Sequence, residues 1–193
     1  VFFSATLSPF AYFRELLGGG SDALQLRLTS PFPQENRLYL HVPDIDTRYR
    51  AREETAWALA RVAEEMVTAC IGNYLMFFPS YVYLNAVRPL IGQLLAGRAA
   101  VLCQTPSMRE EQKRAFLRQL TAPDTGRSNL GLAVLGGLFG EGIDLPGERL
   151  IGVCIVGPGL PMVHEEQELI RAYFQERNEQ GFVLAKANAV LWS

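Results

Sequence analysis

The chain has 193 residues, with 18 Lys and Arg against 20 Asp and Glu, and about half of it (49%) is apolar. The formal charge of −2 excludes a polybasic protein that binds nucleic acid through bulk electrostatics, so any such contact must be local. Neither Lys113 nor Lys186 follows a glycine, which excludes a phosphate-binding GxxxxGK[ST] loop.

The first part of the chain is predicted to form short elements separated by glycine and proline. Residues 1–7 are apolar and rich in strand formers, and the chain starts within this predicted strand without Met. We therefore expect the chain to be part of a longer protein. The next predicted elements are a helix over residues 10–17, a half-buried strand over 37–42 and a long helix from about 50 to 70.

From residue 74 onwards, short apolar runs alternate with amphipathic helices. The predicted strands cover residues 74–78, 99–103, 130–135 and 150–156, and the predicted helices cover 81–95, 108–120 and about 165–175. Fully apolar strands separated by such helices indicate a doubly wound α/β domain, with a mostly parallel sheet covered on both faces. Ligands of these sheets bind beyond the carboxyl ends of the strands.

Small hydroxyl residues lie at the end of the first predicted strand, and polar residues follow two later ones. Ser4, Ala5 and Thr6 are typical of a turn. Ser80 fits either a plain helix N-cap or a hydroxyl that binds a phosphate together with the first helix amides. Gln104 offers an amide for a nucleic-acid phosphate or sugar. Ser107 is predicted to cap the next helix.

A glycine-rich loop at residues 136–148 has five glycines in thirteen residues, which lets the backbone approach a ligand closely. It also holds Glu141 and Asp144, while Ile143 and Leu145 look buried. The two carboxylates suit Mg²⁺, a ribose hydroxyl or an arginine from another domain, and a structural salt bridge is the remaining alternative.

The three cysteines, Cys70, Cys103 and Cys154, lack the close spacing of metal sites, and we expect reduced thiols in the core. No apolar stretch is long enough for a membrane span, so a cytoplasmic protein is expected. No catalytic triad is visible, because the sequence has no Ser or Cys at a nucleophile elbow that could pair with His41 or His164.

Several sequence motifs together resemble the carboxyl-terminal half of DinG/XPD-type superfamily 2 DNA helicases, with the bacterial DinG-like branch the most similar. The resemblance covers about residues 1–181. In chain order the motifs are FSATL at 3–7, SPF at 30–32, FFPSY at 77–81, GEGIDLPG at 140–147 and GPGLP at 157–161, followed by the run 168–174.

The resemblance implies an ATP-dependent DNA helicase of DNA repair, in which two RecA-like domains clamp ATP and Mg²⁺ and move along single-stranded DNA. Residues 1–35 look like the end of the first domain, with motif III and the crossover, and 36–193 like the second domain, ending before motif VI. The implied catalytic residues are Glu141 and Asp144, which contact the nucleotide together with Gly140 and Gly142. The implied DNA-binding residues are Ser4, Thr6, Ser80, Tyr81, Gln104 and Gly137.

Two departures from the family pattern bear on activity. The phosphate-binding loop, and the cysteines of an iron–sulfur cluster in many relatives, belong to a first domain that this chain lacks. No Gln-x-x-Gly-Arg-x-x-Arg motif follows Phe182. We therefore expect the polypeptide alone to be inactive. Two alternatives are a non-catalytic nucleic-acid or protein interaction module derived from a helicase, and a metabolite- or nucleotide-binding α/β domain.

Overall fold

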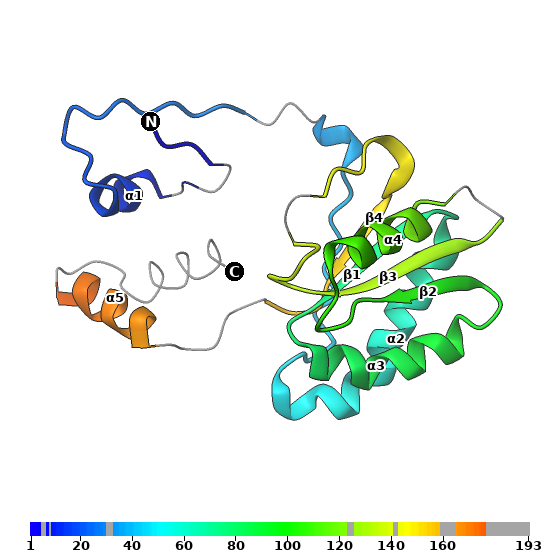
Figure 1. The fold of residues 1–193 in the computed structure, drawn as a ribbon. Coiled ribbons are helices and arrows are strands. Elements are labelled where there is room, and N and C mark those ends of the chain that lie inside the picture. The colour runs from blue at the N-terminus through cyan, green and yellow to red at the C-terminus, as the bar shows by residue number, and fades with distance from the viewer. Residues whose placement is uncertain are drawn as a thin grey trace. The chain divides into compact units, whose positions relative to one another are not determined.

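The computed structural model describes residues 1–4, 7, 9–29, 33–122, 126–140, 143–158 and 165–176 (Figure 1). The chain forms two compact units. Pro43–Pro161 make the larger one, and Val1–Val42 with Met162–Trp192 make the other. The predicted boundary after residue 35 concerns the domains of a longer protein and stays a prediction.

The larger unit is built on four parallel strands in the order β2-β3-β1-β4. In this sheet Phe78 of β1 is in register with Val134 of β3, and Cys103 of β2 with Leu132 of β3. The strands are β1 (Asn73–Phe78), β2 (Ala99–Cys103), β3 (Ser128–Val134) and β4 (Gly152–Ile155). The four predicted strands of this region are therefore confirmed.

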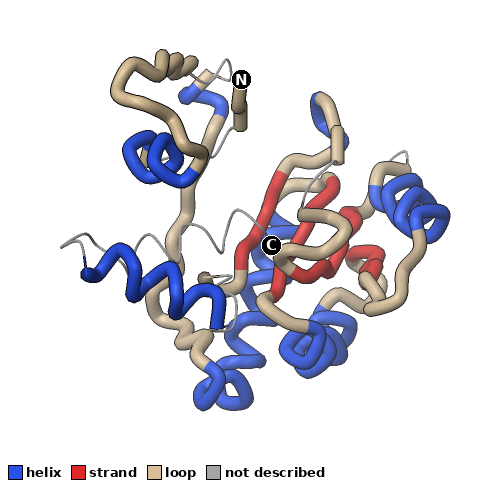
Figure 2. Tube along the Cα trace, turned by 60° about the vertical axis from the view of Figure 1, so that its left-hand side comes forward, coloured by secondary structure: helices blue, strands red, loops and turns tan. Residues whose placement is uncertain are grey.

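Helices cover both faces of the sheet (Figure 2). One face packs against α2 (Arg52–Ala69) and α3 (Tyr81–Leu94), and the other against α4 (Glu110–Leu120). A 3₁₀ turn, η2 (Tyr49–Ala51), precedes α2, and another, η3 (Gly147–Arg149), precedes β4. The predicted doubly wound α/β fold is confirmed.

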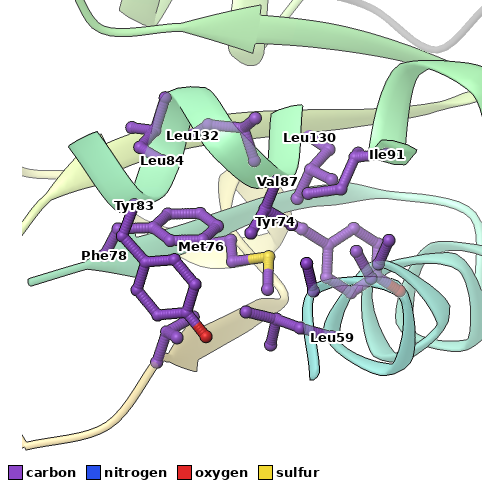
Figure 3. Packing of buried hydrophobic residues seen from close by; sticks show 14 of the residues in the cluster. Leu59, Tyr74, Met76, Phe78, Tyr83, Leu84, Val87, Ile91, Leu130 and Leu132 are labelled. Carbon is purple, nitrogen blue, oxygen red and sulfur yellow. The ribbon is translucent and has the colours of Figure 1, made fainter. Parts of the chain in front are cut away.

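The core beneath α2 and α3 combines aromatic and aliphatic side chains (Figure 3). Phe78 and Tyr83 meet edge to face, with their ring centroids 5.7 Å apart. The buried side chains include Leu59, Tyr74, Met76, Leu84, Val87, Ile91, Leu130 and Leu132. This packing fixes the first turn of α3, and hence Ser80, against the end of β1.

One outer strand of the sheet, β4, has only β1 as a strand neighbour in the described part of the chain. Its side chains alternate between the two faces. Cys154 packs against the core under α2 and α3, whereas Ile151, Val153 and Ile155 are exposed. The sheet therefore presents an apolar edge on the face that α4 covers elsewhere.

The smaller unit contains α1 (Phe10–Leu16), the 3₁₀ turn η1 (Gln34–Asn36) and α5 (Glu165–Glu176). Tyr12 of α1 packs on Phe174 of α5, with the ring centroids 5.0 Å apart. The hydroxyl of Tyr173 donates to Oε1 of Glu15 at 3.2 Å. The predicted helices near residues 10–17 and 165–175 are confirmed.

The strands predicted for residues 1–7 and 37–42 are wrong. Residues 1–4 and 37–42 are exposed and belong to no strand, and Ala5 and Thr6 lie outside the described residues. A strand needs neighbouring strands for its backbone hydrogen bonds and a surface for its apolar face. These segments have apolar residues but no described strand beside them.

All three cysteines are free thiols, but the prediction that all are core residues is wrong for Cys70. Cys70 is exposed because α2 ends at Ala69 and the next residue leaves the buried face. Cys103 and Cys154 are half-buried, and burial raises the pKa of both thiols. None of the described helices is long and apolar enough to cross a membrane.

Candidate functional site

The loops that follow β1, β2 and β3 lie side by side at the carboxyl edge of the sheet, because β3 is inserted between β2 and β1. The amide of Leu135, just after β3, donates to the carbonyl of Phe78 at 2.9 Å. The amide of Gln104, just after β2, donates to the carbonyl of Leu132 at 2.8 Å. The fold thus brings together three of the loops singled out in the sequence.

Ser80 caps α3, as predicted. Its Oγ accepts a hydrogen bond from the amide of Tyr83 at 3.3 Å. A hydroxyl both accepts and donates, and the Ser80 hydroxyl donates to no acceptor in the described residues. The amides of Tyr81 and Val82 also lack acceptors there, as expected in a first helical turn. The cap therefore leaves donors for an anion.

Tyr81 links the loop after β1 to the loop after β2. Its hydroxyl donates to the carbonyl of Thr105 at 3.3 Å, while its ring packs against the core. Burial, and then the nearby Cys103, raise the pKa of Tyr81. A phenol is protonated at neutral pH even without this shift, so the hydrogen bond persists there.

Gln104 is buried, with 3% of its surface exposed, so its amide supports the loops from within. Its Oε1 accepts from the amide of Val134, the last residue of β3, at 2.9 Å. Its Nε2 lies beside Gly137, where an added Cβ would come within 3.0 Å. The side chain predicted to touch nucleic acid thus holds the glycine-rich loop in place.

The glycine-rich loop folds back on itself directly after β3. The amide of Gly137 donates to the carbonyl of Val134 at 3.2 Å, and that of Gly140 to the carbonyl of Gly137 at 2.9 Å. In the described part of the chain, the amides of Gly136 and Leu138 have no acceptor. These two donors, rather than the amide of Gly137, are available to an anion.

Phe139 anchors this loop, a role that the sequence analysis missed. Its ring is 1% exposed and lies 4.5 Å, centroid to centroid, from the ring of Phe116 in α4. The sequence feature that could have indicated this role is a single large aromatic residue among glycines. Such a side chain can fix a backbone that glycines would otherwise leave mobile.

Asp144 is exposed, and its carboxylate has no hydrogen-bond or ion-pair partner in the described residues. Ile143 and Leu145 are half-buried. Glu141 and Gly142 lie outside the described residues, as does Thr6, while Ser4 is exposed in the smaller unit. An exposed carboxylate without a protein partner is able to bind a ribose hydroxyl or Mg²⁺.

The prediction that Ser107 caps α4 is wrong. The N-cap residue is Arg109, and its amide donates to Oε1 of Gln112 at 2.8 Å. The Gln112 side chain thus provides the hydrogen-bond acceptor for a backbone amide at the start of α4. Ser107 lies exposed in the preceding loop.

The parallel sheet, with a serine-capped helix and a glycine-rich loop at its carboxyl edge, defines a RecA-like α/β domain. The family model of the helicase C-terminal domain matches residues 63–191, and the chain belongs to this family.

Two similar proteins are described as the ATP-dependent DNA helicase chl1. The one from Aspergillus niger is 28% identical over 134 residues, and the one from Neosartorya fischeri is 26% identical over 134 residues. Each alignment covers 62% of this chain. It spans only 15% of the first relative and 16% of the second.

Proposed function

We propose that this chain provides the second motor domain of an ATP-dependent DNA helicase, which couples ATP hydrolysis to movement along single-stranded DNA. The observation that carries the proposal is the junction of three loops at one sheet edge, in a chain of the helicase C-terminal domain family. Free donors of Ser80, Gly136 and Leu138 lie in two of these loops, and Gln104 and Tyr81 tie them to the third.

In this proposal the strand is held by hydroxyl and amide donors rather than by many cations. That arrangement agrees with the formal charge of −2. ATP with Mg²⁺, shared with the first RecA-like domain of the same polypeptide, supplies the free energy of phosphoryl transfer when bound. Asp144, with Glu141 three residues before it, faces the nucleotide.

Replacing Ser80 by Asp should weaken binding of labelled single-stranded DNA about tenfold at low salt, measured by fluorescence anisotropy. Aspartate is as good an N-cap as serine, so α3 keeps its start. The new carboxylate repels a phosphate that Ser80 would otherwise contact.

The matched control is Ser80→Asn, which keeps the cap and adds no charge. We expect it to bind DNA within about twofold of the unchanged chain, because an uncharged cap repels no phosphate. Equal affinities for the Asp and Asn variants would contradict the placement of the strand at Ser80. Binding of a phosphorylated metabolite in place of DNA would favour the metabolite-binding alternative.

The 193 residues alone should show no DNA-stimulated ATP hydrolysis, because no phosphate-binding loop and no arginine-finger motif occur in the sequence. The measurement is phosphate release with and without single-stranded DNA. Turnover that scales with the amount of purified chain would refute this prediction.

The finer assignments belong to the same proposal. The first is a function in DNA repair. The second is membership of the DinG-like branch, which is based on the motifs at residues 77–81 and 140–147. Unwinding assays on the full-length protein with defined DNA structures test the first of them.

A further inference from the structure

We propose that the segment Arg48-Tyr49-Arg50-Ala51-Arg52 forms an additional contact for single-stranded DNA, with Tyr49 stacking on a base and Arg50 pairing with a phosphate. This inference rests on the proposed function and adds a contact surface to it. The segment combines exposed aromatic and cationic side chains, the two groups that hold single strands without reading their sequence.

Two independent contacts place this segment at the carboxyl edge of the sheet. Thr47, the residue immediately before the segment, lies against Gly157, just after β4, where an added Cβ would come within 2.5 Å of the Thr47 Oγ1. The guanidinium of Arg52 lies over the ring of Tyr83, 4.5 Å from its centroid. The amide of Tyr83 is the one that Ser80 caps, so the segment borders the proposed strand-binding loop.

Tyr49 is exposed, and its ring contacts the guanidinium of Arg52. Its side chain is among the most exposed aromatic ones, at 82%. The guanidinium of Arg52 lies 5.5 Å from its ring centroid, and Arg52 Nε donates to the carbonyl of Thr47 at 3.2 Å. Because Arg52 also packs on Tyr83, which is 1% exposed, the exposed ring is connected to the core. A ring that already contacts a neighbouring side chain loses less conformational entropy when it stacks on a base.

Arg48 and Arg50 differ in whether their guanidinium groups are already paired with a carboxylate. Arg48 Nε donates to both carboxylate oxygens of Asp46 at 2.9 Å, and hydrogen bonds from Arg48 lower the pKa of Asp46 to about 2. Arg50 is exposed and forms no close ion pair in the described residues, and its charge acts only at longer range on Asp46. Of Arg48 and Arg50, Arg50 is therefore the one whose guanidinium has room for a phosphate, because that of Arg48 is already paired with Asp46.

The test measures anisotropy of a labelled oligothymidine with the full 193-residue chain across a salt series. Tyr49→Ala should weaken binding roughly tenfold, and Tyr49→Phe should retain it, because phenylalanine keeps the stacking face. Arg50→Ala should reduce the slope of log K against log salt by about 0.7, the value for one lost phosphate contact on a single strand.

The matched control is Arg118→Ala, which also removes one exposed guanidinium. Arg118 lies in the last turn of α4, two residues before Leu120, whose carbonyl accepts from the side chain of Asn129 at the start of β3. It is therefore at the opposite, amino edge of the sheet, and its salt slope should equal that of the unchanged chain. Circular dichroism of each variant confirms that the fold is kept.

The outcomes separate this inference from the proposed function. Loss of affinity in Tyr49→Ala with retention in Tyr49→Phe, together with a reduced slope only in Arg50→Ala, supports the contact. DNA binding that responds to Ser80→Asp but not to Tyr49→Ala or Arg50→Ala overturns it and leaves the proposed function standing. Absence of DNA binding by the unchanged chain counts against both.

Discussion

Replacing Gly131 by Ala should lower the free energy of unfolding by about 1–3 kcal/mol, although alanine usually stabilises a chain relative to glycine. Gly131 lies in β3 beneath α4. An added Cβ would come within 2.7 Å of Leu75 Cδ2 and 2.9 Å of Phe116 Cζ. Both side chains are buried, so neither can move aside without disturbing the packing of α4.

The control is the same substitution at Gly92 in α3, where nothing lies within 4 Å of an added Cβ. Gly92→Ala should raise the free energy of unfolding by about 0.5–1 kcal/mol, because alanine is the better helix former. Urea denaturation measures both variants. Equal shifts of the two midpoints would show that the space between β3 and α4 is not as tight as described.

Replacing Gln104 by Met should lower the free energy of unfolding by about 1–3 kcal/mol. The two side chains have similar volume, but methionine offers no good acceptor to the amide of Val134, which would be buried without a partner. The end of β3 would lose its side-chain connection to the loop after β2 and keep only the backbone hydrogen bond from Gln104 to Leu132. Urea denaturation and hydrogen exchange of the Val134 amide measure the two effects.

Gln112 provides the comparison, because its Oε1 also accepts from a backbone amide, that of Arg109, but at an exposed position. Water can replace this acceptor, so Gln112→Met should cost about 0.5 kcal/mol or less. If the free energy of unfolding falls equally in the two variants, burial does not explain the contribution of the Gln104 hydrogen bond to stability.

The sequence predicted the strands and helices of the larger unit because each carries its own periodic pattern. The run at residues 74–78 is apolar throughout, as a strand buried on both faces requires, and β1 spans Asn73–Phe78. The two wrong strands, at 1–7 and 37–42, had suitable composition, but no pattern within a segment reveals whether a second strand lies beside it.

The candidate site was predicted only in part, for a related reason. Ser80 was recognised as a cap from its place before an amphipathic helix, which is local information. The position of Gln104 depends on β3 being inserted between β2 and β1, and spacing along the chain does not give that order. A helix was predicted from about residue 50, and the segment at 48–52 received no role of its own, although three arginines around one exposed tyrosine were the available signal.

The outer strand β4 has a consequence for handling the protein. In the described part of the chain, the backbone amides and carbonyls on its outer side pair with no strand, and the exposed Ile151, Val153 and Ile155 lie along the same edge. Such an edge is a template for strand addition by a second molecule. When the chain is purified alone, self-association through β4 should grow with concentration, and Val153→Lys should suppress it by placing a charge on the edge.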